Sequence, residues 1–300
     1  MASSVPPGPV ATLPIWGSVA AVFRTVLLEN LAYFPRAVLA PLLLTFLILL
    51  LQIRFGTPLV QTEGGAPPAP SLTDYLLSFA GLVPYVIFAV AWHRLVLLGP
   101  NRGLPAYQPT WGRRHFHFLG YMLLLVVMAG LVFGVLGFAA SLLLPGSAAP
   151  EETGGGNLLA LTVFLLLLLL VGWFTMRLCF VLPARALDER YGLSDSWRQT
   201  RGQGLRILAV LVIVQLVIAI PSVIVVSLIG AGTGVMAVIN QMGSGHTFEA
   251  GILLLGVLPV LILGFLASYL ATALGVTVLS QAFKTCSGWQ PPAEPVTEPE

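Results

Sequence analysis

Two histidines separated by one residue, His115 and His117, form the spacing in this chain that comes nearest to a metal site. On a helix, residues i and i+2 face apart, and no cysteine or carboxylate accompanies them. The alternative interpretation is a loop beside lipid headgroups, in which Arg113, Arg114 and the histidines contact phosphates. The nucleophile-elbow, phosphate-loop and paired zinc-ligand patterns do not occur. We therefore expect a non-enzymatic protein with no metal and no cofactor.

The most distinctive polar segment spans residues 177–202 and joins two apolar stretches. Pro183 marks the point where the chain should leave the membrane and continue as a short helix. Gly192 suits the C-terminus of that helix, and Ser194 suits the N-cap of the next one. The segment is therefore predicted to be a helical elbow between two spans.

Two interpretations of the charges in this elbow stay open. In the first, Arg185 pairs with Glu189 and Arg198 pairs with Asp195, so that salt bridges fix how the flanking spans pack. In the second, a basic collar holds anionic lipid headgroups or docks a cytoplasmic partner. Over the whole chain, the candidate contacts to headgroups or to a partner are Arg113, Arg114, Arg185, Arg198 and Arg201.

Three residues inside the apolar stretches are candidates for a central cavity: Gln215, Pro221 and Pro259. An amide in lipid needs a hydrogen-bond partner, which a substrate or a neighbouring helix could supply. Proline inside a helix leaves a carbonyl free or bends the helix. The interiors of the spans hold no ionisable residue, which argues against a proton-coupled transporter or an ion channel but not against passage of lipids or neutral solutes.

The elements that carry these residues follow from composition. The chain has 300 residues, of which 57% are hydrophobic and 9% are charged, whereas soluble domains carry about 25% charged residues. A net charge of +2 without a dense basic surface gives no reason to expect nucleic-acid binding. Six stretches have the roughly 20 apolar residues that a membrane-spanning helix needs. They lie near residues 36–54, 74–97, 118–144, 158–182, 205–229 and 250–283.

The basic residues predict the orientation of these spans. Of the 14 Lys and Arg residues, all but Arg54 lie before the first span, after the sixth, or around the second and fourth loops. The remaining loops carry glutamates instead. By the positive-inside rule, both termini are cytoplasmic. The expected location is a bacterial cytoplasmic (inner) membrane.

Both ends of the chain have their own patterns. Residues 1–14 are expected to be flexible, and residues 284–300 to form a disordered cytoplasmic tail rich in Pro and Glu, although the absence of Gly and Pro before Ser287 allows the sixth helix to pass Phe283. Residues 15–283 form a single membrane domain. Its first helix is amphipathic and either lies in the cytoplasmic interface or packs against the bundle. The residues of its predicted apolar face are Ile15, Trp16, Val19, Phe23, Val26, Leu27 and Asn30.

The elbow resembles one found in a family of bacterial multi-pass proteins, typified by the membrane domain attached to some glycerophosphoryl diester phosphodiesterases. The positions that carry the resemblance are Arg177, Phe180, Leu182-Pro183-Ala184, Gly192, Ser196-Trp197, Thr200, Arg201 and Gly202. It extends in outline from Ile15 to Phe283. The resemblance implies a six-span architecture and a lipid-linked setting. Phosphodiesterase activity is not carried over, because only a short Pro/Glu-rich tail follows the sixth span.

The sequence therefore predicts an all-α, polytopic bundle of about six transmembrane helices with an interfacial N-terminal helix. The expected function is non-enzymatic interaction with membrane phospholipids or with another membrane protein. The alternative is a transporter or permease for a lipid or neutral solute. A membrane enzyme acting on lipids is the third class, and it lacks a candidate nucleophile or metal set.

Overall fold

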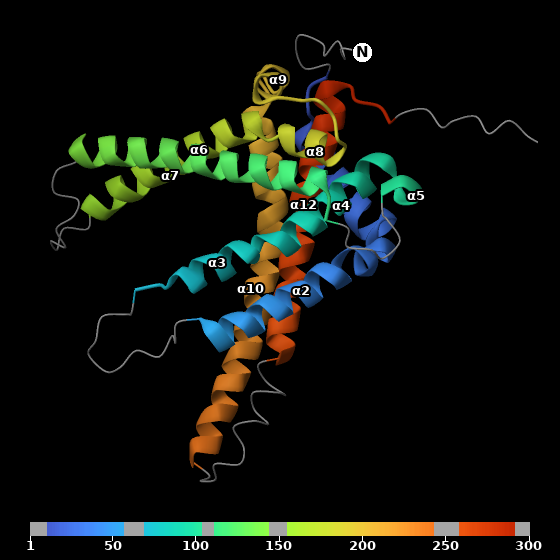
Figure 1. Ribbon diagram of the computed structural model, residues 1–300. Helices are drawn as coiled ribbons and strands as arrows, with labels where there is room; N and C mark the ends of the chain where they lie inside the picture. Colours follow the sequence, from blue (N-terminus) through green and yellow to red (C-terminus); the bar gives the residue numbers. More distant parts are fainter. Residues whose placement is uncertain (1–10, 57–68, 104–110, 144–154, 243–257, 292–300) are drawn as a thin grey trace, which may run out of the picture.

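The structure, a computed structural model, describes residues 11–56, 69–103, 111–143, 155–242 and 258–291 (Figure 1). Within these ranges all regular structure is helical, which confirms the predicted all-α fold. In chain order the helices are α1 (Ile15–Phe23), the π-helix η1 (Arg24–Glu29), the 3₁₀-helix η2 (Leu31–Tyr33), α2 (Phe34–Phe55), α3 (Leu72–Ala80), α4 (Leu82–Leu98), α5 (Pro100–Gly103), α6 (Arg113–Leu143), α7 (Gly155–Leu178), α8 (Val181–Ala186), α9 (Leu193–Gln199), α10 (Gly204–Met242) and α12 (Leu258–Ser287).

Six helical segments in these ranges are long and apolar enough to cross a membrane, as predicted. Only 6–33% of the most apolar window of each segment is buried within the protein, so most of their apolar surface is free to contact lipid. The chain is thus an integral, multi-pass membrane protein. The segments are Leu31–Phe55, Leu72–Leu98, Arg113–Ala140, Leu161–Ala186, Gly204–Val225 and Leu258–Ser287.

Two of the predicted spans differ in detail from the helices observed. The second is divided into α3 and α4 at Gly81, because Pro84 has no N–H to donate to the carbonyl one turn earlier. The fifth was expected to end at residue 229, but α10 continues to Met242 over 39 residues. Residues 250–257, the predicted start of the sixth span, lie outside the described ranges.

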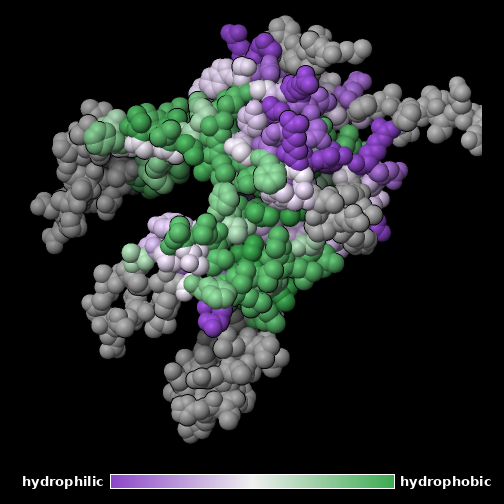
Figure 2. Space-filling model, in the orientation of Figure 1, coloured by the Kyte–Doolittle hydropathy of each residue, from purple (hydrophilic) through white to green (hydrophobic). Residues whose placement is uncertain are grey.

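The helices diverge as pairs from one common end of the molecule (Figure 1). The long helices α10 and α12 pack along each other, α6 packs on α7, and α2 packs on α3 and α4. The short helices α5, α8 and α9 gather at the common end. Hydrophilic side chains concentrate there, whereas the diverging pairs present hydrophobic surface (Figure 2). We call this end the polar end.

An aromatic cluster joins α2, α4 and α12 below the polar end. Trp92 is fully buried and stacks on Phe88, with ring centroids 5.6 Å apart, while Phe34 meets Trp92 edge to face at 5.8 Å. The indole N–H of Trp92 donates to Thr277 Oγ1 at 2.9 Å. Tyr269 meets Phe88 edge to face, with ring centroids 5.1 Å apart. The polar tip of Trp92 therefore has a partner within the core, as a buried indole requires.

Both ends of the described chain are more ordered than predicted. Leu13 is buried, and its backbone N–H donates to Gln203 Oε1 at 3.1 Å. α12 continues past Phe283 to Ser287, and Trp289 packs on the Phe283 ring. The expectation of a flexible segment 1–14 is therefore wrong for Leu13, and that of a disordered tail 284–300 is wrong as far as Trp289. Residues 1–10 and 292–300 lie outside the described ranges.

Candidate functional site at the polar end

The elbow after α7 is held by two hydroxyl side chains from α9 and the turn that follows it. Ser196 Oγ donates to the carbonyl of Arg177 at 2.9 Å and accepts the N–H of Phe180 at 3.2 Å. Thr200 Oγ1 lies 2.9 Å from the same Arg177 carbonyl. The last carbonyls of a helix have no partner within the helix. Ser196 and Thr200 provide one where α7 ends.

The Arg177 side chain is part of the same elbow. Its guanidinium carbon lies 3.7 Å from the centroid of the Trp197 ring, and Nη2 donates to the Trp197 carbonyl at 2.6 Å. A Cβ atom at Gly204 would come within 2.9 Å of Arg177 Cγ, so this position needs glycine for close packing. These contacts give Arg177, Ser196, Trp197 and Thr200 structural roles in joining α7 to α10.

The predicted capping of α8 and α9 is wrong. α8 ends at Ala186, well before Gly192, and Gly192 itself is the N-cap of α9. The Asp195 carboxylate accepts the N–H of Gly192 at 3.0 Å. This bond and the acidic charge in the first turn stabilise the start of α9 without Ser194.

A buried tyrosine packs beside this elbow. The Tyr191 hydroxyl donates to Gln199 Oε1 at 2.6 Å. Burial, with the nearby Asp195 carboxylate as a smaller cause, raises the pKa of the Tyr191 phenol above its ordinary value. The phenol therefore stays protonated and keeps its role as a donor.

Three of the five candidate arginines are engaged within the protein. Arg198 pairs with Asp195 at 3.0 Å, as predicted from their spacing. Arg114 pairs with Asp188 at 3.3 Å. The predicted pair of Arg185 with Glu189 is wrong: Arg185 Nη2 donates to Tyr121 Oη at 3.0 Å, and its guanidinium lies over the Tyr121 ring. Arg185 is thus bound to Tyr121 on α6 and not to Glu189.

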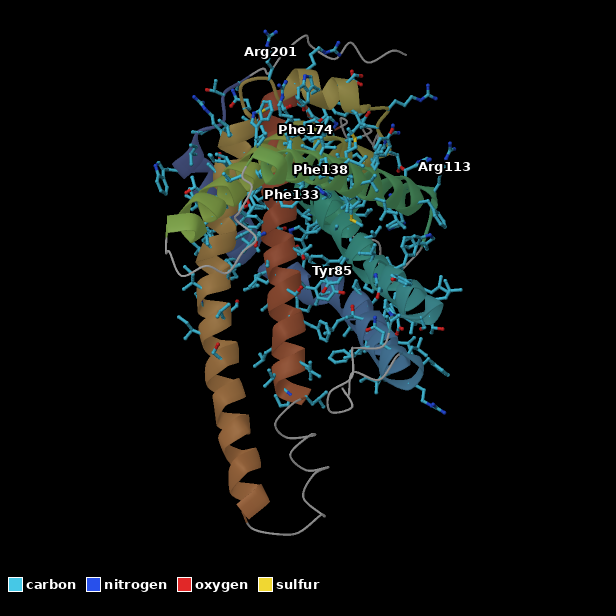
Figure 3. All side chains as sticks on the ribbon, turned by 90° about the vertical axis from the view of Figure 1, so that its left-hand side faces the viewer. Tyr85, Arg113, Phe133, Phe138, Phe174 and Arg201 are labelled. Atoms are coloured by element: carbon cyan, nitrogen blue, oxygen red, sulfur yellow. The ribbon has the colours of Figure 1, made fainter. Side chains whose placement is uncertain are left out.

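The other two, Arg113 and Arg201, are exposed on different sides of the polar end (Figure 3). Within the described part of the chain, neither side chain forms an ion pair or a hydrogen bond. Exposed cations without a counter-charge are free to meet anions from outside the protein.

The candidate cavity residues do not face a common space in the described structure. Gln215 on α10 donates its amide N–H to the Ala271 carbonyl of α12 at 3.0 Å. Pro221 and Pro259 are both exposed. Gln215 therefore joins two helices, which is the alternative role that its position in the span allowed.

Removing the Gln215 bond should weaken the α10–α12 contact modestly. We expect Gln215→Leu to lower the free energy of unfolding by about 0.6 kcal/mol, the average for interhelical hydrogen bonds in membrane proteins. Unfolding of the purified protein by SDS in mixed micelles measures this. A loss of several kcal/mol would contradict so limited a role, and Ser222→Ala, which removes a bond within α10 alone, is the control.

The N-terminal amphipathic helix packs against α10 and α12 through one face of α1 and η1. Val22 and Val26 are fully buried, whereas Trp16 is 75% exposed and Leu28 is 80% exposed. Of the predicted apolar face, Trp16 and Leu27 are exposed, so the face that packs on the protein covers only part of it. Of the two alternatives for this helix, packing against the bundle describes one face, and the exposed apolar side chains leave the other face able to contact the membrane interface.

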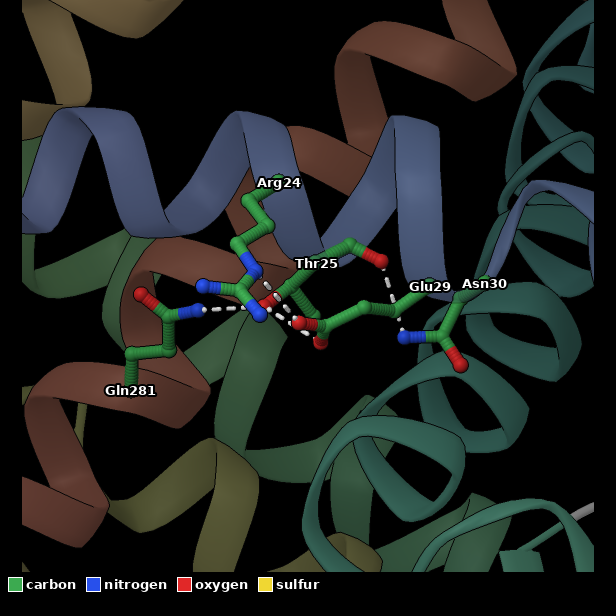
Figure 4. Close-up of polar contacts among 5 residues, drawn as sticks. All are labelled: Arg24, Thr25, Glu29, Asn30 and Gln281. Carbon is green, nitrogen blue, oxygen red and sulfur yellow. Dashed lines mark hydrogen bonds and ion pairs between the residues drawn. The ribbon is translucent and has the colours of Figure 1, made fainter.

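A cavity of about 430 Å³ opens beside this helix at the polar end, where sequence reasoning expected no site. The close-up shows the polar network on one of its walls (Figure 4). The lining residues come from η1 and its flanks, the α4–α5 junction and α12. They are Thr25, Glu29, Asn30, Tyr33, Leu95, Val96, Leu97, Gly99, Pro100, Ser280, Gln281 and Lys284.

One signal in the sequence could have drawn attention to this cavity. Lys284 is the only lysine among the 300 residues, and it lines the cavity from α12. The other contributors are ordinary polar residues of the N-terminal segment, with no motif that distinguishes them. Their role depends on α12 lying beside η1, which is a long-range contact.

Comparisons of the chain with protein-family models, with curated proteins and with solved structures gave no match. Among the described residues, no group of three or more His, Cys, Asp or Glu side chains is placed to hold a metal ion. The assignment of function therefore depends on the polar end itself.

Proposed function

We propose that this membrane protein is a non-catalytic, phospholipid-binding protein whose polar end faces the cytoplasm at a bacterial inner membrane. The observation that carries the proposal is the exposure of Arg113 and Arg201 without a counter-charge among the described residues. Arg114, Arg185 and Arg198 are used within the protein and are withdrawn as primary headgroup contacts. Arg113 and Arg201 are the two predicted contacts that remain.

The neighbouring apolar side chains support a membrane contact at this end. Trp16 and Leu28 project from the N-terminal helix beside the polar surface. Tryptophan is enriched at membrane–water interfaces, where its ring meets the headgroups. Basic residues beside such side chains add attraction to anionic lipids, of about 1 kcal/mol each.

The resemblance to the multi-pass family enters the proposal through the elbow. We infer a relationship because four of the shared positions, Arg177, Ser196, Trp197 and Thr200, form one contacting cluster. A lipid-linked setting is what the resemblance implies. The permease alternative has no comparable support in the described residues, since Gln215 is used between helices.

The proposal predicts a loss of anionic lipid on removal of the two exposed arginines. In Arg113→Ala/Arg201→Ala, we expect the preference for phosphatidylglycerol over phosphatidylcholine to fall about tenfold or more, given about 1 kcal/mol for each basic residue. Native mass spectrometry of the gently purified protein measures the lipids retained.

The control is Arg54→Ala, which removes an exposed arginine that stacks on Phe55 far from the polar end. It should leave the lipid preference nearly unchanged. If the double variant retains as much phosphatidylglycerol as the wild type, Arg113 and Arg201 are not headgroup contacts and the proposal fails.

A further inference from the structure

The π-helix η1 shapes one wall of the cavity beside the N-terminal helix. Its wide turn ends at Asn30, whose backbone N–H and side-chain Nδ2 both donate to the Thr25 carbonyl, at 3.0 and 2.9 Å. π-helical turns are rare in proteins overall, and those that occur often lie at functional sites. Here the turn places Thr25, Glu29 and Asn30 together on the cavity wall.

A chain of polar contacts connects this wall to α12 (Figure 4). Gln281 Nε2 donates to Thr25 Oγ1 at 3.0 Å, and Thr25 Oγ1 donates to Glu29 Oε2 at 3.3 Å. Arg24 Nε lies 3.0 Å from Glu29 Oε1. The Gln281 and Asn30 amides each have a second N–H beyond the one used here. These bonds hold the wall in place and leave one N–H group on each of the two amides free to donate.

The charges at the cavity leave a single positive charge. Two charged residues line it, Glu29 and Lys284. Arg24 neutralises the Glu29 carboxylate. The Lys284 ammonium forms no ion pair or hydrogen bond with any described residue. One uncompensated ammonium beside two amide donors matches an anion with one negative charge.

Another part of the lining is apolar. It consists of Leu95, Val96 and Leu97 at the end of α4 and Pro100 at the start of α5. Leu28, next to the cavity residue Glu29 in the chain, is 80% exposed and is free to contact acyl chains. A volume of about 430 Å³ lies within the range of roughly 300–1,000 Å³ that small-molecule sites occupy. This combination fits an anion carried on an apolar body better than a free inorganic ion.

We propose that this cavity binds the phosphodiester group of one phospholipid molecule, with Lys284 as its counter-charge. The phosphate oxygens accept hydrogen bonds from Lys284 and from the free N–H groups of Gln281 and Asn30. The site rests on the proposed function and specifies where a single phospholipid molecule binds. It is separate from Arg113 and Arg201, which do not line the cavity.

The single lysine makes a direct test possible. An amine-acetylating reagent on the full chain in neutral detergent modifies Lys284 and the N-terminal amine, which peptide mass spectrometry separates. Phosphatidylglycerol, which has no amine, should slow acetylation of Lys284 about tenfold, because the bound phosphate holds the ammonium in a charge-assisted hydrogen bond and the lipid covers it. Diethyl phosphate and inorganic phosphate are tested in parallel.

Two kinds of variant keep the test specific. Arg190→Lys introduces a second lysine on the exposed turn before α9, and its acetylation reports the general effect of anionic micelles. The acetylation rate at position 190 should change less than twofold when phosphatidylglycerol is added. Val96→Trp fills the cavity, and Pro100→Trp does so from its exposed rim; each should abolish protection by phosphatidylglycerol while Lys284 remains reactive.

The outcomes separate the possible sources and the two proposals. Protection by diethyl phosphate at the concentration at which phosphatidylglycerol acts would overturn the lipid as the source and assign a soluble phosphodiester. Equal protection of both lysines, or protection that survives both tryptophan variants, would overturn the cavity site. If the cavity test fails while Arg113→Ala/Arg201→Ala still loses anionic lipid, the proposed function stands without this site.

Discussion

Replacement of Trp92 by alanine is expected to lower the free energy of unfolding by about 3–5 kcal/mol, the range measured when a buried aromatic side chain is truncated. Trp92 is fully buried between Phe34 and Phe88, and its removal leaves a cavity where α2, α4 and α12 meet. The indole hydrogen bond to Thr277 is lost as well. Because lipid is as apolar as the core, this loss reflects packing more than transfer from water.

SDS-induced unfolding in mixed micelles, followed by circular dichroism, measures the change. Trp16→Ala is the matched control, because Trp16 is 75% exposed and its removal should change the stability by no more than about 0.5 kcal/mol. Trp92→Phe, which keeps a ring but loses the N–H, should fall between the two. Similar losses for Trp92→Ala and Trp16→Ala would show that the aromatic cluster does not hold the three helices together.

The second large effect is expected at the elbow. Ser196→Ala combined with Thr200→Val should lower the free energy of unfolding by about 2–4 kcal/mol, since a buried group left without its hydrogen-bond partner costs about 1–3 kcal/mol. The two groups are the N–H of Phe180 and the carbonyl of Arg177. Neither has another partner in the described structure once both hydroxyls are gone.

The same unfolding measurement compares this double variant with Ser194→Ala. Ser194 is exposed, and with Gly192 as the N-cap of α9 its replacement should have little effect. A loss of about 1 kcal/mol in Ser194→Ala, typical for removal of an N-cap, would restore the original assignment of Ser194 as the cap. Wild-type stability in the double variant would show that water or lipid supplies the missing partners.

The parts of the fold that sequence predicted correctly are those decided over short distances. Six spans follow from apolar stretches of sufficient length, and the Asp195–Arg198 pair follows from a spacing of three residues on one helix. The split at Gly81 also has a local cause, which is the missing N–H of Pro84.

The parts that were missed depend on which helices become neighbours. Arg185 contacts Tyr121, which is 64 residues away, in preference to Glu189 four residues away. The cavity requires Thr25 and Gln281 to meet across 256 residues. No periodicity in a single chain reports such contacts. For the same reason, the candidate arginines could be chosen by charge but not sorted into paired and free ones.

The contact between η1 and α12 also orders events during synthesis. The Gln281 side chain that Thr25 needs is made 256 residues later, which at about 5–20 residues per second takes roughly 13–50 s. During that interval the α12 surface that packs on α1 and η1 does not yet exist. Until α12 is made, we expect the first helix to lie in the membrane interface, where lipid covers its apolar side chains, including Trp16 and Leu28. The N-terminal segment is thus the first part made and among the last to dock. If synthesis stops before α12, the segment lacks the α12 surface against which it packs.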